Sequence, residues 1–293
     1  MTSDRTVLVV GATGTFGTHV VPELHRRGVT VRALARSQDR AEVARRAGAD
    51  EVAIGDLTDA ASLRAAVYGA DGVFHLNPVF VPDEAAMGVR VVEAARDAGA
   101  TTFVFSSVYH PSMSLTNHAG KRPVEEALFA SGLRFTVLQP AIFFQTLDGL
   151  WASARDHGRI GLPFLTTARQ AFVDYRDVAE VAARAFVEDT FADGTFELAA
   201  PGTRTRVEIA GLMAAVLGRE VTAEAPEFGS WADAVGLVAG PERDGMRRMF
   251  EEYDRHGFPG GNALVLRAAL GREPRALDAY IAELAGPAGQ RSA

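Results

Sequence analysis

The sequence predicts an α/β fold with a doubly wound parallel sheet and a smaller, mostly helical C-terminal domain. Two observations predict it. Strand and helix patterns alternate through the first two thirds of the 293 residues, which is typical of a parallel sheet with helices on both faces. In addition, the apolar run Val7–Val10 suits a strand buried on both faces and leads directly into a glycine-rich turn and a helical pattern. We therefore expect a Rossmann-type arrangement.

The turn is Gly11-Ala12-Thr13-Gly14-Thr15-Phe16-Gly17, and a helix is expected over Gly17–Arg27. At such a strand-to-helix turn the backbone passes close to a pyrophosphate, and the helix N-terminus attracts its charge. A side chain at Gly11 or Gly14 would obstruct that approach. Glycine turns also serve tight strand–helix packing, but the context favours a dinucleotide. The predicted binding residues here are Gly11, Thr13, Gly14, Thr15, Phe16 and Gly17.

The remaining elements of the predicted sheet follow in order. Strands are expected at Thr30–Leu34, Glu51–Ile54, Gly72–Leu76, Thr102–Ser106 and Arg134–Leu138. Helices are expected at Ala41–Ala47, Ala60–Tyr68, Ala85–Ala98 and Arg122–Ala130. A glycine stands just beyond a helix at Gly28, Gly48, Gly69 and Gly99, where a left-handed residue often ends a helix.

The pattern is less regular beyond Pro140. A Gly/Pro-bearing loop is expected at Gly158–Pro163, a helix at Asp177–Glu188 and a strand at Thr195–Leu198, the last two rejoining the sheet. A final apolar-striped helix is expected at Arg275–Leu284. We therefore predict a dinucleotide-binding domain of residues 1–140 and 171–200, and a smaller substrate-binding region of residues 141–170 and 201–293.

Composition limits the classes of function. The formal charge of −7 and the pI near 5.6 argue against a general nucleic-acid or membrane-surface binder. There is no cysteine, hence no disulfide or zinc–thiolate site, and the scattered histidines indicate no metal site. No leader or membrane-spanning run is evident. We expect a cytoplasmic monomer or homodimer that binds neither nucleic acid nor membrane.

The end of the second strand indicates which nicotinamide cofactor is bound. An acidic residue there would bind the ribose 2'-hydroxyl and repel a 2'-phosphate. This chain has Ala35-Arg36-Ser37 instead, and Arg36 can form charge-assisted bonds to a 2'-phosphate, with Ser37 helping. NADP(H) is therefore the predicted cofactor; the alternative is an exposed strand-end arginine. Asp56 and Leu57 follow the third strand, where Asp56 can accept from the adenine amino group or form a turn with Gly55.

Taken together, these motifs resemble the NmrA-like group of atypical short-chain dehydrogenases, which contains quinone, dye and azo reductases as well as NADP-sensing regulators. The likeness covers VLVVGATGTFG, VRALAR ending at Arg36, EVAIGDLTD, FVFSSV, the block from Lys121 to Gln145, FVDYRDVAEVAARAF from Phe172, and GREP from Gly271. Typical short-chain dehydrogenases place a tyrosine four residues before a lysine. The charge of that lysine lowers the pKa of the tyrosine phenol, which can then transfer a proton. Asn117 occupies that position before Lys121. The resemblance therefore implies the fold and the cofactor but puts the usual mechanism in doubt, since family members without the tyrosine include sensors.

Lys121, Tyr109 and His110 are the predicted catalytic residues, and His118 is a further candidate proton donor. The resemblance implies that Lys121 contacts the nicotinamide ribose, where it could also polarise or protonate a carbonyl; alternatively Lys121 forms an exposed pair with Glu125. Tyr109 and His110 follow the fifth strand and could donate a proton, as could His118, although plain loop roles are an alternative. Three further residues at carboxyl ends of strands are expected to line the cofactor groove: Asn77, Pro78 and Ser106.

A group of aromatic residues beyond the sixth strand can be interpreted in two ways. Such a cluster can wall a pocket for a planar, apolar substrate or fill the joint between domains; its members are Phe143, Phe144, Trp151, Phe164 and Phe172. Asp174 and Asp177 are not read as a carboxylate pair, because Asp177 suits a helix cap or first turn. The sequence predicts an NADPH-dependent reductase of a small aromatic or conjugated carbonyl, quinone or enone. The alternatives are a non-catalytic NADP(H)-sensing regulator and a small-molecule binder with a vestigial nucleotide site.

Overall fold

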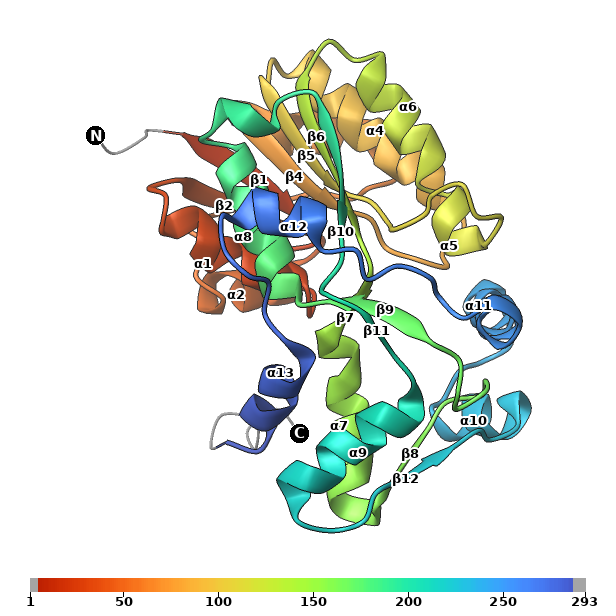
Figure 1. The fold of residues 1–293 in the computed structure, drawn as a ribbon. Coiled ribbons are helices and arrows are strands. Elements are labelled where there is room, and N and C mark those ends of the chain that lie inside the picture. Colours follow the sequence, from red (N-terminus) through yellow and green to blue (C-terminus); the bar gives the residue numbers. More distant parts are fainter. Residues whose placement is uncertain (1–4, 287–293) are drawn as a thin grey trace. The chain divides into compact units, whose positions relative to one another are not determined.

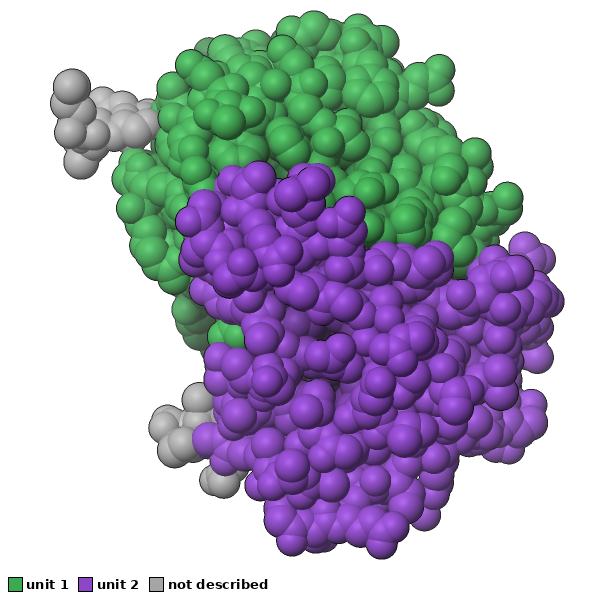
Figure 2. Space-filling model, viewed as in Figure 1, with its two compact units in different colours: residues 1–140, 175–197 green, residues 141–174, 198–293 purple. Residues whose placement is uncertain are grey.

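A computed structural model describes residues 5–286 and divides the chain into two compact units, residues 1–140 with 175–197 and residues 141–174 with 198–293 (Figure 2). The division differs from the expected one at residues 171–174 and 198–200. The reason is β9 (Gln170–Val173), which pairs with β7 (Ile142–Phe143) and β11 (Thr203–Arg204) of the second unit.

The first unit is built on a seven-stranded sheet of order β10-β6-β5-β4-β1-β2-β3 (Figure 1). Its strands are β1 (Thr6–Val10), β2 (Thr30–Ala35), β3 (Glu51–Ile54), β4 (Gly72–Leu76), β5 (Thr102–Ser106), β6 (Arg134–Pro140) and β10 (Gly194–Leu198). The strands β1 to β6 pair in parallel, with Val9 opposite Ala33 of β2 and Phe74 of β4. The doubly wound parallel sheet is thus confirmed, and its switch point lies between β1 and β4.

Most helices of this unit follow the strands as predicted, with small shifts of their bounds, whereas the short helices at Thr116–Ala119 and Asp189–Phe191 were not predicted. The helices are α1 (Val20–His25), α2 (Gln38–Arg46), α3 (Ala60–Val67), α4 (Glu84–Asp97), α5 (Thr116–Ala119), α6 (Arg122–Phe129) and α8 (Tyr175–Ala185), with the short 3-10 helices η1 (Gly17–His19) and η3 (Asp189–Phe191). Side chains of α3, α4 and α6 fill one core with the sheet, and α1 contacts α8. The four glycines that follow helices, Gly28, Gly48, Gly69 and Gly99, all have positive φ, as predicted.

The second unit contains more regular structure than the sequence indicated. It holds η2 (Phe144–Leu147), α7 (Asp148–His157), β8 (Arg159–Gly161), α9 (Arg206–Leu217), β12 (Thr222–Glu224), α10 (Phe228–Ala234), α11 (Pro241–His256), α12 (Leu264–Leu270) and α13 (Leu277–Leu284). The loop expected at Gly158–Pro163 is therefore wrong in part. β8 pairs in parallel with β12, more than 60 residues away, and such a partner cannot be read from three residues.

The aromatic residues expected to wall a pocket or fill a joint mostly form the core of the second unit. Phe144, Trp151 and Phe172 are buried together with side chains of α9 and α13. Phe164 stacks on Phe250, with ring centroids 5.5 Å apart. Asp174 is fully buried and accepts a hydrogen bond from Gln145 Nε2 at 2.9 Å. Asp177 lies in the first turn of α8, as predicted.

Candidate functional site

The three glycines of the turn after β1 have different roles, some in packing the turn and one in leaving space beside it. Gly11 has a φ of 94° and accepts a hydrogen bond at 3.0 Å from the amide of Gly14, which closes the turn. A Cβ on Gly17 would lie 2.1 Å from the Gly11 carbonyl oxygen, so Gly17 is required for packing. A Cβ on Gly14 would meet only that same oxygen at 3.4 Å, and Gly14 is exposed. The Gly14 amide and carbonyl are bonded within the turn, the carbonyl to the Thr18 amide at 3.2 Å, so what Gly14 leaves open to a ligand is the exposed space that a side chain would fill.

This turn lies beside the carboxyl end of β4. A Cβ on Gly11 would approach the carbonyl oxygen of Leu76 to 3.4 Å, and Leu76 is the last residue of β4. Leu76 in turn pairs with Ser106, the last residue of β5. The carboxyl ends of β1, β4 and β5 therefore bring together the turn, Asn77 and Ser106, at the edge where open α/β sheets bind ligands.

Tyr175 belongs to this group, and the sequence analysis did not single it out. It is fully buried at the start of α8, its hydroxyl donates to Ser106 Oγ at 3.2 Å, and its ring centroid lies 5.6 Å from that of Phe16 in the turn. Burial raises the pKa of the Tyr175 phenol. The available sequence signal was its position in the FVDYRDV block, between the two aspartates that were considered.

Arg36 is exposed directly after β2, which is compatible both with a 2'-phosphate contact and with the alternative of an exposed strand-end arginine. Ser37 caps α2 by accepting from the Arg40 amide at 3.3 Å. Asp56 forms a turn, but with Thr58 rather than Gly55: its Oδ1 accepts from the Thr58 amide at 2.7 Å and from Thr58 Oγ1 at 2.6 Å. These bonds, helped by the Arg36 charge, lower the pKa of Asp56. Leu57 beside it packs against the sheet core.

Lys121 is buried, with 2% of its surface exposed, and its ammonium donates to Glu84 Oε1. The alternative of an exposed pair with Glu125 is therefore wrong. Glu125 Oε1 instead accepts from Ser107 Oγ at 2.5 Å and from Gln139 Nε2 at 3.0 Å. Burial lowers the pKa of Lys121, and the Glu84 carboxylate partly opposes that shift.

Asn77 connects this ion pair to a buried histidine. Its Nδ2 donates to the Glu84 carbonyl oxygen at 2.9 Å, and its Oδ1 lies 2.5 Å from His75 Nε2. Because an amide oxygen only accepts, Nε2 carries the proton. Burial lowers the pKa of His75 to about 3, so the ring is neutral. Asn77 is itself buried, and Pro78 is half-buried.

Tyr109 and His110 lie where β5 leads into the next loop. Tyr109 is buried, its amide donates to the Pro140 carbonyl at 3.0 Å, and its ring packs edge-on to His110. Burial, assisted by the Glu197 charge, raises the pKa of the Tyr109 phenol. His110 has a φ of 56°, and its carbonyl lies 3.1 Å from His118 Nδ1. A raised phenol pKa is the opposite of what a lysine-activated tyrosine would have.

Residues 5–286 offer neither a membrane-spanning helix nor a metal-binding cluster. No helix there is long and apolar enough to cross a membrane. No group of three His, Asp or Glu residues is arranged to hold a metal ion in that range.

Comparisons with known proteins agree with this architecture. The model of the NmrA-like family matches residues 3–281. An NAD(P)H azoreductase from Xenophilus azovorans is 31% identical over 217 residues, 73% of this chain and 75% of that protein. An NADPH-dependent quinone oxidoreductase from Escherichia coli, solved with NADPH, superimposes with a TM-score of 0.82 at 22% identity, over 96% of this chain and 100% of that one.

A transcriptional regulator is also among the similar structures. NmrA, a negative transcriptional regulator solved with NADP, superimposes with a TM-score of 0.77 at 19% identity, over 96% of this chain and 95% of that one. At these identities the structural likeness shows a shared fold, while the family model covers nearly the whole sequence. The chain therefore belongs to the NmrA-like family.

Proposed function

We propose that this protein is an NADP(H)-dependent reductase that acts on a small aromatic or conjugated carbonyl, quinone or enone. The observation that carries the proposal is the glycine turn after β1, where Gly14 leaves the approach to the backbone free of a side chain, together with a cation and no carboxylate at the end of β2. Relatives named as an NAD(P)H azoreductase and a quinone oxidoreductase support the reaction class.

The residues of the first unit fit the cofactor. Gly11, Thr13, Gly14, Thr15 and Phe16 would hold the pyrophosphate at the helix N-terminus. Arg36 would bind the 2'-phosphate, and Asp56 and Leu57 would contact the adenine. Lys121 would contact the nicotinamide ribose, and the cofactor groove would be lined by Asn77, Pro78 and Ser106. The second unit, residues 141–174 and 198–293, would supply the substrate pocket.

In such a reductase the bound cofactor supplies the hydride, and the protein orients the substrate and supplies a proton. Lys121 is the proposed proton source, because its ammonium can donate to a developing oxyanion or amine. Tyr109 and His110 are the competing donors. The raised pKa of Tyr109 makes it the weaker acid, so we rank Lys121 before it.

A second function is favoured by the residue at position 117. Asn117 stands where a short-chain dehydrogenase would have its tyrosine. The similar structure of NmrA, a negative transcriptional regulator, supports the same alternative. The alternative is therefore a non-catalytic sensor that binds NADP(H) and changes partner affinity with its redox state.

One experiment separates the two functions. NADPH and NADP⁺ are titrated against the protein, and quinones, enones and azo compounds are then screened for consumption of NADPH. A reductase will consume NADPH with at least one of them. Tight binding of both cofactor forms with no turnover on any compound would favour the sensor, and failure to bind either form would overturn both.

A further inference from the structure

Lys121 is the only lysine in the chain; the other 29 of its 30 cationic Lys and Arg side chains are arginine. The two residue types differ chemically at a buried site. A guanidinium stays charged in proteins, whereas an ammonium is compact and its pKa shifts readily on burial. Lys121 is buried, so the charge of this single lysine depends on its neighbours.

The neighbour that carries the opposite charge is Glu84, the first residue of α4. It is 5% exposed, and its two carboxylate oxygens have different partners. Oε1 accepts from the Lys121 ammonium, and Oε2 accepts from the Phe80 amide at 3.2 Å. The carboxylate thus links the segment after β4 to the residue that precedes α6.

Two glycines allow these elements to approach so closely. A Cβ on Gly88 would lie 2.4 Å from Val124 Cγ2 and 2.9 Å from Asn77 Nδ2. A Cβ on Gly120 would lie 3.3 Å from the Glu84 carboxyl carbon. Without a side chain at these positions, α4 can pack against α6 and bring Glu84 to Lys121.

The segment between β4 and α4 is held in an unusual backbone conformation. Phe80 and Asp83 have φ values of 59° and 60°, which non-glycine residues rarely adopt. Glu84 holds this segment at its first residue and at its middle, since its carbonyl accepts from Asn77 and its carboxylate accepts from the Phe80 amide. Conformations of this kind persist only where surrounding contacts enforce them, and they cluster at functional sites.

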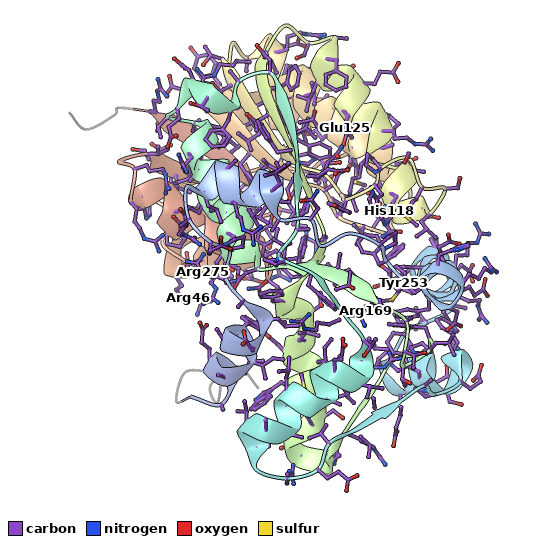
Figure 3. The ribbon with its side chains drawn as sticks, viewed as in Figure 1. Arg46, His118, Glu125, Arg169, Tyr253 and Arg275 are labelled. Carbon is purple, nitrogen blue, oxygen red and sulfur yellow. The ribbon has the colours of Figure 1, made fainter. Side chains whose placement is uncertain are left out.

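The other titratable groups around Lys121 do not provide a counter-ion. His75 of β4 and His118 of α5 each have a pKa that burial lowers and that the Lys121 charge lowers further. Glu125, one turn further along α6, bonds to Ser107 and Gln139. His118 and Glu125 are labelled in Figure 3. Among the described residues, Glu84 is the carboxylate that bonds to the ammonium.

We propose that Glu84 is the positioning residue for Lys121: it holds the single side-chain ammonium in its charged form and fixes it at the carboxyl edge of the sheet, where it can donate to bound NADP(H) and substrate. An ammonium has three donors, of which Glu84 takes one. This inference rests on the proposed function only for what Lys121 donates to. The electrostatic relation between the two residues can be tested by itself.

The first test uses the single lysine as its own reporter. Protein grown with ¹⁵Nζ-lysine has one side-chain ammonium signal to follow as the pH is raised. In Glu84→Gln the ammonium stays buried without its counter-ion, so we expect it to lose its proton at a pH lower by about one unit or more. Glu84→Asp retains the charge and should restore most of the wild-type titration if the variant reaches Lys121.

Glu125→Gln is the matched control. It removes a second buried carboxylate that lies one helical turn from Lys121, and the Gln oxygen can still accept from Ser107 and Gln139. Its ammonium should titrate as in the wild type. Circular dichroism will show whether Glu84→Gln is folded. If the folded variant's Lys121 ammonium titrates as in the wild type, Glu84 does not hold the charge and the inference is wrong.

The second test measures NADPH binding between pH 6 and 9. As Lys121 loses its proton in Glu84→Gln, the dissociation constant should rise about tenfold relative to wild type, whereas Glu125→Gln should follow the wild type. A constant ratio at all pH values would indicate a purely structural role for Glu84. If the wild type binds no NADP(H), the proposed function fails, and the ¹⁵Nζ titration still decides whether Glu84 holds the ammonium.

Discussion

Gly17 lies so close to the carbonyl oxygen of Gly11 that a Cβ on Gly17 would stand 2.1 Å from it. The contact joins the end of β1 to η1, and its oxygen belongs to the backbone, which cannot move aside as a side chain can. Gly17→Ala should therefore lower the free energy of unfolding by about 3 kcal/mol or more, measured by urea denaturation.

Gly14→Ala provides the contrast within the same turn. Its φ is not positive and its new methyl group would meet only one atom, at 3.4 Å, so stability should change by less than about 1 kcal/mol. The methyl group would instead obstruct the pyrophosphate, and the NADPH dissociation constant should rise tenfold or more, about 1.4 kcal/mol. Equal stability losses in both variants would contradict this division of roles.

Arg36→Ala should weaken NADPH binding while leaving NADH binding almost unchanged, because only NADPH carries the 2'-phosphate that a guanidinium can bind. A loss of about 1 to 3 kcal/mol is expected, measured by calorimetric titration. Arg45→Ala is the control, since Arg45 is an exposed arginine of α2 that pairs with Glu42. Equal losses for both cofactors in Arg36→Ala would refute the phosphate assignment.

Stability should fall in mild acid because of His75. Its pKa is about 3 in the folded protein and about 6.5 in an unfolded chain. Between these values the unfolded state binds more protons, so the free energy of unfolding falls as the pH is lowered, by up to about 1.4 kcal/mol per pH unit. Denaturation at pH 6.5 and 4.5 measures the slope.

His75→Gln isolates this contribution. The glutamine amide can still donate to Asn77 but does not titrate, so the variant should lose less stability than the wild type over the same pH interval. All carboxylates and all other histidines are the same in both proteins, so the difference between them reports on His75. If the free energy of unfolding falls equally with pH in both proteins, the buried His75 ring does not cause the loss of stability in acid.

Tyr175→Phe should cost only about 0.5 to 1.5 kcal/mol of stability, because it removes the bond to Ser106 and leaves the ring that faces Phe16. NADPH affinity should stay within about twofold of wild type. Tyr175→Ala removes the ring as well and should cost about 3 to 5 kcal/mol. If Tyr175→Phe instead loses as much stability as Tyr175→Ala, the hydroxyl and not the ring makes the main contribution and this expectation is wrong.

Some parts of the fold could be predicted to the residue. The bounds of β3, β4 and β5 agree with the expected strands Glu51–Ile54, Gly72–Leu76 and Thr102–Ser106. Each is a short apolar run that follows a helix and its terminal glycine by a few residues. For β4 and β5 the apolar run reflects the burial of both faces, whereas β3 is the edge strand of the sheet and its Glu51 and Ile54 are exposed. β8 lacked such a pattern, and the partner that makes it a strand is β12, far along the chain.

The amino-acid sequence by itself determined the glycine turn, the cation after β2, the missing phenol at Asn117 and the single lysine, because these depend on residue type and short spacing. The tertiary structure alone decided the partner of Lys121. Glu84 is 37 residues away in α4, whereas the local sequence spacing pointed to Glu125 in α6, four residues after Lys121. Packing decides between them, since Gly88 and Gly120 let α4 and α6 approach until one carboxylate meets the ammonium.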